Sequence, residues 1–438
     1  MRNRQVRIIK HTRDMIDSKK ILRKFRTKKK YFTRDRKLTL PRLAVLVIRG
    51  HKMPNQNAIN KFFRELDEVD NVPTSSAYSQ ARRKFKGELF LELNHGVVAT
   101  FYEKDEDYQK DVKLWKGKRI LAADCTIINL PYKKGLRKKY SIQTNGTDQE
   151  RLQAQASLLY DVLNDIAINV WLDKKKSEKS YLFERHENFI KEDDIITLDI
   201  VYSDYSVFAE FTSKSKPFIV RDSLSGTFRE VSDFARSQKT DEVVSLRVTE
   251  KQKEFVKKNH LPEQLEVRLI KVMLEDSKVE ILISNLFGSE YKVEDFKELY
   301  GKRWNEETYF NRLKNLFEVE KFTGEDDLVI KQDFYGIIYL STLESILSKG
   351  ADEELKEKSQ ELKYPYQVNR SLSISTMLDY TVDLLMNQSK SSEEVVDELS
   401  TFLKYNPCLN RPNRKYDRHN KSINKTLWFY KYKKKTIA

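Results

Sequence analysis

The stretch L-W-K-G-K-R-I-L-A-A-D-C-T-I-I-N-L-P, residues 114–131, decides the fold, because it is the pattern of a buried β-strand that carries one acid. An apolar run at 120–123 ends in Asp124, and apolar residues resume at Ile127 and Ile128. A buried ionised carboxylate is costly unless it is paired or coordinates a metal. The pattern therefore predicts a cation beside Asp124, either a metal ion or, as the alternative, the partner in a structural salt bridge.

A second stretch, E-L-Y-G-K-R-W-N-E-E-T-Y-F-N-R-L-K-N-L-F-E-V-E-K-F at residues 298–322, predicts a helix with two stripes. Four polar residues spaced by three, four and seven fall within an arc of about 60° at about 100° per residue. Phe310, Leu313 and Phe317 form an adjacent apolar stripe. The alternative is an ordinary amphipathic helix with one i, i+4 ion pair. The four polar residues are Tyr300, Arg303, Glu307 and Lys314.

The pattern Y-x2-R-x3-E-x6-K, with Trp304 directly after the arginine, resembles the signature of the DDE transposases of bacterial insertion sequences, in their IS-four family. The resemblance implies that Glu307 is the third acid of an Asp-Asp-Glu triad holding two divalent metal ions. It also implies that Asp124 is the first acid, since its strand and the following Leu-Pro are similar to the family's. Tyr300, Arg303 and Lys314 would then contact DNA phosphates near the cut.

The second acid comes from D-D-I-I-T-L-D-I-V-Y-S-D-Y-S-V-F-A-E-F, residues 193–211. Asp199 directly follows a strand-like run and fits the family's register, whereas the alternative, Asp204, fits a helix N-cap. Ile200 and Val201 stand where the family has Arg and Gly. This departure removes a cation and a conformationally permissive residue. A catalytically degenerate protein is therefore an alternative interpretation.

Three carboxylates from separate segments suit in-line cleavage of a phosphodiester. Two metal ions about 3.5–4 Å apart can activate the attacking oxygen and stabilise the leaving one. Carboxylate oxygens favour Mg²⁺, for which Mn²⁺ can substitute. The sequence does not predict a zinc site, because Cys125 and Cys408 are far apart and the six histidines show no ligand spacing.

The charge of the chain is concentrated at its ends. Of the total of +16, residues 1–38 carry +13 and residues 411–438 carry +9, so the rest of the chain carries −6. Basic ends around an acidic middle favour binding of a polyanion such as DNA. The alternative is that the basic ends are solvated tails that bind no partner. The hydrophobic content of 39%, the absence of long apolar runs and the two cysteines predict a soluble cytoplasmic protein with no membrane contact. The resemblance implies that it is bacterial and nucleoid-associated.

The order of elements predicts an α/β fold, a ribonuclease-H-like core interrupted by a β-rich insertion, with helical regions at both ends. In the N-terminal region, two helices at 38–66 precede a third, continuous helix at 77–93, which is capped at 74–76 and carries Arg82, Arg83 and Lys84 toward DNA. A small bundle with a solvated basic face is the alternative. The core strands are expected at 120–124, 154–159, 166–172, 195–199 and 218–221, with helices at 177–190 and 206–213.

The expected domains are an N-terminal DNA-binding domain 1–110, the first part of the core 111–223, the insertion 224–290, the Glu-bearing helix 291–345, and a C-terminal helical region with a basic tail 346–438.

Residues 224–290 contain three strand-like segments, and the resemblance implies that this insertion helps to hold DNA. Arg268 and the pair Ser284-Asn285 match positions of the family's pattern, with plain sheet structure as the alternative role. The C-terminal region could form a homodimer.

The function predicted is a transposase that moves an insertion sequence by cut-and-paste, acting on the terminal inverted repeats and on target DNA, as a homodimer in the synaptic complex. Whether the reaction passes through a DNA hairpin intermediate is left undecided by the sequence. The alternatives are a catalytically degenerate, transposase-derived DNA-binding protein and a host repair nuclease that needs no terminal repeats.

Overall fold

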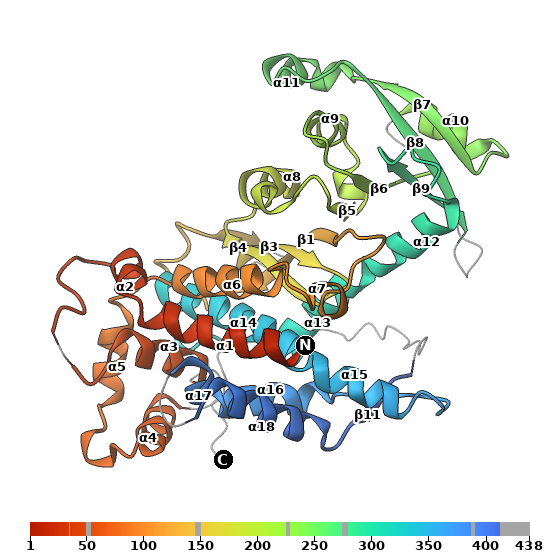
Figure 1. Cartoon of the computed structure of the whole chain (residues 1–438). Helices are drawn as coiled ribbons and strands as arrows, with labels where there is room; N and C mark the ends of the chain where they lie inside the picture. The colour runs from red at the N-terminus through yellow and green to blue at the C-terminus, as the bar shows by residue number, and fades with distance from the viewer. Residues whose placement is uncertain are drawn as a thin grey trace.

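The computed structural model describes residues 1–34, 36–49, 54–144, 150–224, 228–273, 279–386 and 390–411. These residues form a mixed α/β structure built around one large mixed sheet (Figure 1). The predicted basic tail falls almost wholly at 412–438, outside the described residues. No helix in the described part of the chain is long and apolar enough to span a membrane.

The sheet runs in the order β2-β3-β1-β5-β6-β9-β8-β7, and β4 also pairs with β3. The neighbours β1/β5 and β5/β6 are parallel, and the other pairs are antiparallel. All the predicted core strands are present, and β2 was not predicted. The strands are β1 (Ile120–Asn129), β2 (Ser141–Thr144), β3 (Glu150–Asp161), β4 (Ile166–Asp173), β5 (Ile195–Leu198), β6 (Phe218–Asp222), β7 (Asp241–Arg247), β8 (Gln264–Met273) and β9 (Val279–Ser284), with a separate pair β10 (Tyr366–Gln367) and β11 (Cys408–Leu409).

The segment predicted as an insertion extends the main sheet. β9 pairs with β6 of the core, and β8 and β7 follow outward from it. Two helices accompany these strands, α10 (Arg229–Arg236) and α11 (Lys253–Lys258), and the whole segment reaches away from the helical part of the molecule (Figure 1). The predicted strands are therefore confirmed, and together they continue the core sheet.

Helices cover both faces of β3 and β4. On one face lie α6 (Glu88–Phe101) and the long α14 (Asp327–Leu347), which also pack on each other. On the other face lies the helix predicted at 177–190, which is present as a short α-helix, α8 (Glu178–Tyr181), continued by π-helical and 3₁₀ turns to Phe189. The predicted helix after the second acid is α9 (Tyr205–Ser213), and the Glu-bearing segment forms α12 (Val293–Lys302) and α13 (Trp304–Asn315).

The third N-terminal helix was predicted as continuous, and this was wrong. Thr74 caps α5 (Ser75–Arg82) as predicted, but the chain leaves the helix, forms a bridge between Phe85 and Arg26, and restarts as α6. A Cβ on Gly87 would lie 2.7 Å from the backbone of Lys331 and Gln332. The break thus allows close contact between this loop and α14.

The basic N-terminal segment is packed structure. Its first helix, α1 (Arg2–Asp17), contacts α6, α17 and α18 and buries Ile8, Ile9 and Ile16, and Arg4 is fully buried beside Asp111. The N-terminal and C-terminal helices therefore form one layer below the sheet in Figure 1. The other helices are α2 (Lys19–Phe25), α3 (Leu40–Arg49), α4 (Asn55–Glu65), α7 (Tyr108–Asp111), α15 (Lys349–Lys358), α16 (Arg370–Asp379), α17 (Thr381–Leu385) and α18 (Ser392–Lys404).

A buried histidine ties β3 and β4 to the irregular segment after α8. His186 Nε2 lies 2.9 Å from Ser157 Oγ, and its Nδ1 lies 3.0 Å from Asn169 Nδ2. Because an amide nitrogen only donates, Nδ1 accepts and the ring is neutral. Burial, with a smaller contribution from Arg185, lowers the pKa of His186 to about 3.

This histidine should make the protein less stable in acid. Between the ordinary pKa of 6.5 and the buried value of about 3, the unfolded chain binds a proton that the folded chain excludes. As the pH is lowered through that window, the free energy of unfolding should decrease, by up to about 1.4 kcal/mol per pH unit from this group. In urea unfolding at pH 7, 6 and 5, His186→Gln should lose this component, while His11→Gln, at an exposed position, should keep the wild-type slope. Equal slopes for wild type and His186→Gln would contradict the assignment.

Candidate active site

The first two acids lie side by side because of strand register. Ala123 of β1 pairs with Leu198 of β5 in a parallel arrangement, so Asp124 and Asp199 follow at the same edge of the sheet. The carboxylate of Asp124 accepts a hydrogen bond from the Cys125 N–H at 2.7 Å. Burial, together with the charges of Asp199 and Glu307, raises the pKa of Asp124 to about 6 against the opposing effects of the Cys125 hydrogen bond and Arg303. The three predicted acids therefore share one electrostatic environment.

A cation that the sequence analysis did not single out lies beside Asp199. β5 and β6 are parallel with Leu198 opposite Val220, so Arg221 is the register neighbour of the second acid. Its guanidinium lies 2.7 Å from Asp199 Oδ1 and 3.1 Å from Glu280 Oε1. A charged residue near the end of an apolar strand, in F-I-V-R-D, was the available signal.

The other candidate for the second acid serves as a helix cap. Asp204 accepts a hydrogen bond from the Ser206 N–H at 3.0 Å at the start of α9 and pairs with Lys179. This is the N-cap role expected for it. Asp199 itself caps the short turn Ile200–Tyr202, accepting from the Ile200 N–H at 2.6 Å.

The third acid comes from α13, which begins after a short interruption of the predicted helix at Arg303. Arg303 is buried, and its Nη2 lies 3.3 Å from Glu307 Oε1. Burial opposes its charge, but Tyr300, Asp199, Glu306 and Glu307 outweigh this and raise the pKa of Arg303. Arg303 thus serves as a counter-charge held among the acids.

The remaining members of the polar stripe hold the helix in place. Lys314 Nζ donates to Thr126 Oγ1 at 2.6 Å, and Thr126 lies on β1 two residues after Asp124. Tyr300 is buried, with the Arg303 guanidinium 5.5 Å from its ring centre. The stripe therefore positions α13 against the strand that carries the first acid.

Two further acids belong to this cluster and were missed. Glu306 is fully buried, and burial, then the charge of Asp124, raises its pKa well above the usual value. Glu178, on α8, also faces Asp124, and burial raises its pKa to about 7. Glu306 lies next to the predicted Glu307 in the sequence, but nothing in a single sequence shows which of two adjacent acids is turned inward.

The acids gather without forming a finished metal site. Among the residues described, no group of three or more His, Cys, Asp or Glu is arranged to hold a metal ion. Arg221 and Arg303 bind Asp199 and Glu307 instead, which offsets the mutual repulsion of the carboxylates. The donor chemistry nevertheless fits a hard divalent cation, since the groups are carboxylates and neither oxygen of the buried Glu306 has a hydrogen-bond partner.

Two arginines expected to contact DNA are structural. Arg82 is buried, with Nη2 2.7 Å from Asp333 and Nε 2.8 Å from Gln332, so it joins α5 to α14. Arg268, also buried, forms a two-point ion pair with Asp241 across β8 and β7. Both guanidinium groups are used inside the protein, which corrects the expectation that they face DNA.

The pair Ser284-Asn285 also has a sheet role. Ser284 Oγ donates to the Phe218 carbonyl at 2.6 Å, and Asn285 Oδ1 accepts from the Phe218 N–H at 2.9 Å. These bonds join the end of β9 to the start of β6. The alternative considered from the sequence, plain sheet structure, is therefore confirmed for them.

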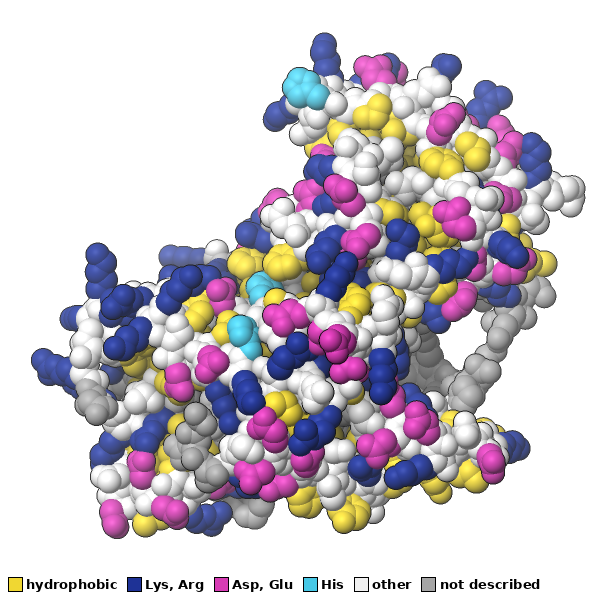
Figure 2. Space-filling model, viewed as in Figure 1, with side chains coloured by type: hydrophobic (Ala, Val, Ile, Leu, Met, Phe, Trp, Pro, Cys, Tyr) yellow, Lys and Arg dark blue, Asp and Glu magenta, His cyan; other side chains and the backbone are white. Residues whose placement is uncertain are grey.

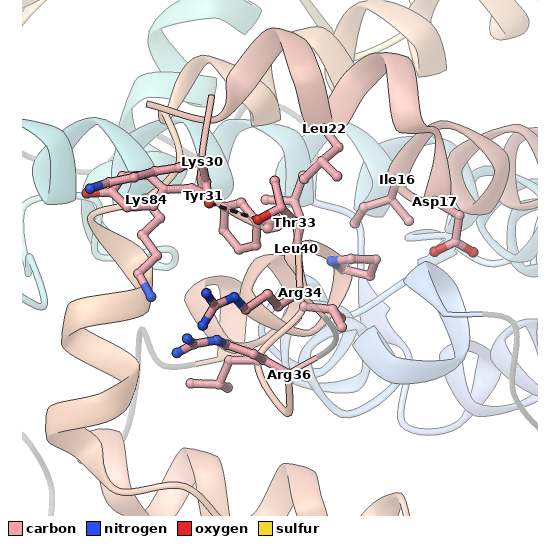
Figure 3. A pocket seen from close by; sticks show the side chains of 14 residues that line it. Ile16, Asp17, Leu22, Lys30, Tyr31, Thr33, Arg34, Arg36, Leu40 and Lys84 are labelled. Carbon is pink, nitrogen blue, oxygen red and sulfur yellow. Dashed lines mark hydrogen bonds between the residues drawn. The ribbon is translucent and has the colours of Figure 1, made fainter. Parts of the chain in front are cut away.

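A basic pocket lies between α2 and α3. It has a volume of about 640 Å³, with Leu22 and Leu40 among its apolar lining residues. The side chains of Arg34, Arg36 and Lys84 extend toward the same side of it (Figure 3). Lys and Arg also gather on the surface over this part of the molecule (Figure 2), including Lys28, Lys29, Lys30 and Lys37, all exposed. Arg83 is 69% exposed and pairs with Asp326.

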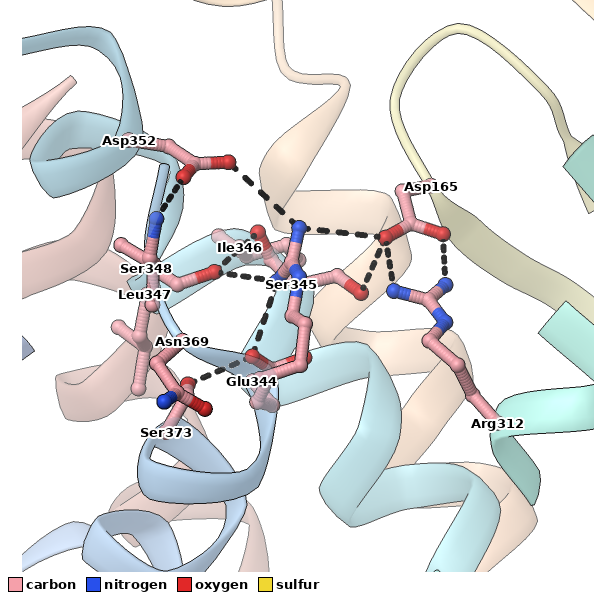
Figure 4. A network of polar contacts seen from close by, with 12 residues as sticks. Asp165, Arg312, Glu344, Ser345, Ile346, Leu347, Ser348, Asp352, Asn369 and Ser373 are labelled. Atoms are coloured by element: carbon pink, nitrogen blue, oxygen red, sulfur yellow. Dashed lines mark hydrogen bonds and ion pairs between the residues drawn. The ribbon is translucent and has the colours of Figure 1, made fainter. Parts of the chain in front are cut away.

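An ion-pair network connects α13 to the turn between β3 and β4 and to helices α14 and α16 (Figure 4). Asp165, in the turn between β3 and β4, accepts from Arg312 Nη1 of α13 at 2.6 Å. Arg370 of α16 lies 3.7 Å from the same carboxylate and 2.9 Å from Glu344 of α14. Burial opposes the charge of Asp165, but Arg312 outweighs it and lowers the pKa of Asp165. The helix bearing Glu307 is thus tied to the sheet and to the C-terminal helices.

Comparisons with known proteins identify a matching family model and similar solved structures. Residues 115–343 match the family model described as "Transposase DDE domain". A cryo-EM structure of a piggyBac transposase synaptic complex with hairpin DNA is similar at a TM-score of 0.44 and 10% identity, covering 96% of this chain and 89% of that chain. No curated protein matches.

Replacing the acid at the centre of the network should destabilise the whole protein. Asp165→Asn leaves Arg312 and Arg370 without their shared carboxylate, and it should lower the free energy of unfolding by about 2–3 kcal/mol. Asparagine tolerates the positive φ of 62° at this position, so the backbone is unaffected. Urea unfolding is the measurement. The matched control is Asp233→Asn, whose exposed carboxylate pairs only with arginines of its own helix and should change stability by less than about 0.5 kcal/mol.

Proposed function

The chain belongs to the transposase DDE domain family, and we propose that it moves an insertion sequence of the IS-four kind by cutting DNA at terminal inverted repeats and joining it to a target. What supports this proposal is that Asp124 and Asp199 follow paired residues of the parallel strands β1 and β5, and that the charges of Asp199, Glu307 and Arg303 all act on Asp124. The fold proposed for the core is ribonuclease-H-like. The strand order β4-β3-β1-β5-β6 supports this fold. Strand β3 is antiparallel to β1, whereas β5 and β6 run parallel to β1.

Each acid has a role in the proposed reaction. Asp124 and Asp199 would hold the metal pair from the sheet edge, and Glu307 from α13, with Mg²⁺ as the natural ion and Mn²⁺ as a substitute. When bound, two such ions would supply a deprotonated water for attack and would stabilise the leaving oxygen. Arg303 and Arg221 would release the carboxylates to the ions and then contact phosphate oxygens. Lys314 and Tyr300 would keep α13 in register with β1.

Arg221 supports an active enzyme over a degenerate one. The substitution of Ile200 and Val201 for the family's Arg and Gly removes a cation next to the second acid, and both side chains are exposed, at 37% and 51%. Arg221 provides a guanidinium at 2.7 Å from the same carboxylate, from the neighbouring strand. A positive charge therefore lies next to Asp199, although it comes from a different position in the sequence.

DNA contact is proposed for the N-terminal region. Arg34, Arg36 and Lys84 line one pocket, and Arg83 lies exposed near it, so a phosphate backbone would meet several cations at once. The function proposed further includes a homodimer in the synaptic complex and a bacterial, nucleoid-associated location. These last two proposals rest on the family resemblance.

Cleavage should depend on a divalent metal and on the element's ends. Purified protein with Mg²⁺ should nick a duplex that carries the inverted repeats flanking its own gene, and EDTA should abolish nicking. Asp124→Asn and Glu307→Gln should each reduce the nicking rate at least about 1000-fold, because each removes a charge from the centre that stabilises the transition state. The readout is the labelled 3′ end on a denaturing gel.

The same assay separates the competing functions. Glu298→Gln, on the exposed side of α12, is the matched control and should nick at the wild-type rate. Tight binding without nicking would favour the degenerate DNA-binding protein. Nicking that is equally fast without the repeats would favour a repair nuclease.

The basic pocket should set the salt dependence of DNA binding. Replacing Arg34 and Arg36 together by alanine should weaken binding and reduce the slope of log affinity against log salt by up to about 1.8, if each arginine neutralises one phosphate. The control replaces Arg2 and Lys10, exposed cations of α1 that pair with Asp397 and Glu393 of α18. Fluorescence anisotropy at several salt concentrations measures both. An unchanged slope for the pocket variant would place the DNA elsewhere.

A further inference from the structure

We propose that Glu306 is a fourth carboxylate ligand of the metal centre, next to the triad of Asp124, Asp199 and Glu307. The inference rests on the proposed function, because it concerns the same metal site. It assigns a residue that lies outside the Y-x2-R-x3-E-x6-K pattern.

Glu306 combines complete burial with a lack of partners. Its side chain is 0% exposed, and neither carboxylate oxygen has a hydrogen-bond partner in the described structure. An ionised carboxylate buried in this state is unfavourable unless a cation neutralises it. Glu344, another buried glutamate, shows the usual solution, since it accepts from Arg370 at 2.9 Å and from Ser373 at 2.6 Å. Both oxygens of Glu306 are therefore buried, free of hydrogen bonds in the described structure and available to a metal ion.

The surroundings of Glu306 place that metal ion in the catalytic centre. α13 packs on β1, and the acid with the strongest effect on Glu306 is Asp124, followed by Glu307 and Glu178. The charged group of opposite sign nearby is Arg303, which lies 3.3 Å from Glu307. A divalent ion between Glu306 and Asp124 would satisfy both buried carboxylates.

The position of Glu306 on α13 separates its role from that of its neighbour. Adjacent helical residues point about 100° apart. Glu307 is 36% exposed and is held by Arg303, whereas Glu306 is turned into the protein. Binding through Glu307 requires an ion pair to open, and binding through Glu306 does not. Glu306 should therefore bind metal in the protein without DNA.

Metal binding to the DNA-free full-length chain tests this assignment. Mn²⁺ titrations followed by electron paramagnetic resonance should show that Glu306→Gln weakens the tighter Mn²⁺ site at least about 10-fold. Asp124→Asn should weaken it as well, and Glu298→Gln should leave it unchanged. Without metal, Glu306→Gln should melt at or above the wild-type temperature, because a neutral amide is easier to bury than an unpaired carboxylate.

The outcomes are distinct. If Asp124→Asn loses Mn²⁺ but Glu306→Gln binds like wild type, Glu306 is a structural carboxyl group and the inference is overturned, while the proposed function stands. If Glu306→Gln does not fold, Glu306→Met, of similar volume, replaces it in the same titration with the same expectation. If wild type binds no Mn²⁺ without DNA, the inference fails, and the nicking assay decides the proposed function separately.

Discussion

Mutual repulsion among clustered carboxylates is the constraint on which the rest of this structure depends. The parallel register of β1 and β5 puts Asp124 and Asp199 side by side, and α13 adds Glu306 and Glu307. Such a cluster is unfavourable unless cations neutralise it. In the protein alone, Arg221 and Arg303 provide part of this compensation through direct ion pairs.

The surrounding structure holds this unfavourable cluster together. Lys314 fastens α13 to β1, and the network of Asp165, Arg312 and Arg370 fastens the same helix to the β3–β4 turn and to the C-terminal helices. Arg82 does the equivalent for the N-terminal helices by pairing with Asp333 of α14. Several basic residues of this chain are therefore used to assemble the layers, whereas those at the pocket beside α2 lie at the surface.

Local sequence patterns predicted most of the elements. Apolar runs and alternation located the core strands and those of the extension, because burial on a sheet selects such residues wherever the strand ends up. They failed at the helix containing Gly87 and Arg82, where close contact with α14 overrode a continuous helical pattern. The segment at 177–190 is helical as predicted, but its α-helical part is limited to α8, and π-helical and 3₁₀ turns follow where His186 is buried against Ser157 and Asn169. Both departures involve contacts between residues far apart in the chain.

The sequence by itself determined the identity of the three candidate acids and the type of element that carries each, because motif spacing and strand patterns are local. Only the tertiary structure decided which charges meet. Register across two parallel strand pairs brought Arg221 to Asp199, and the packing of α13 turned Glu306 inward beside Asp124. Arg82 and Arg268, which the sequence analysis predicted to contact DNA, form ion pairs inside the protein instead. The physical reason is that the energy of a charge depends on its neighbours and its burial, and a linear chain specifies neither until it folds.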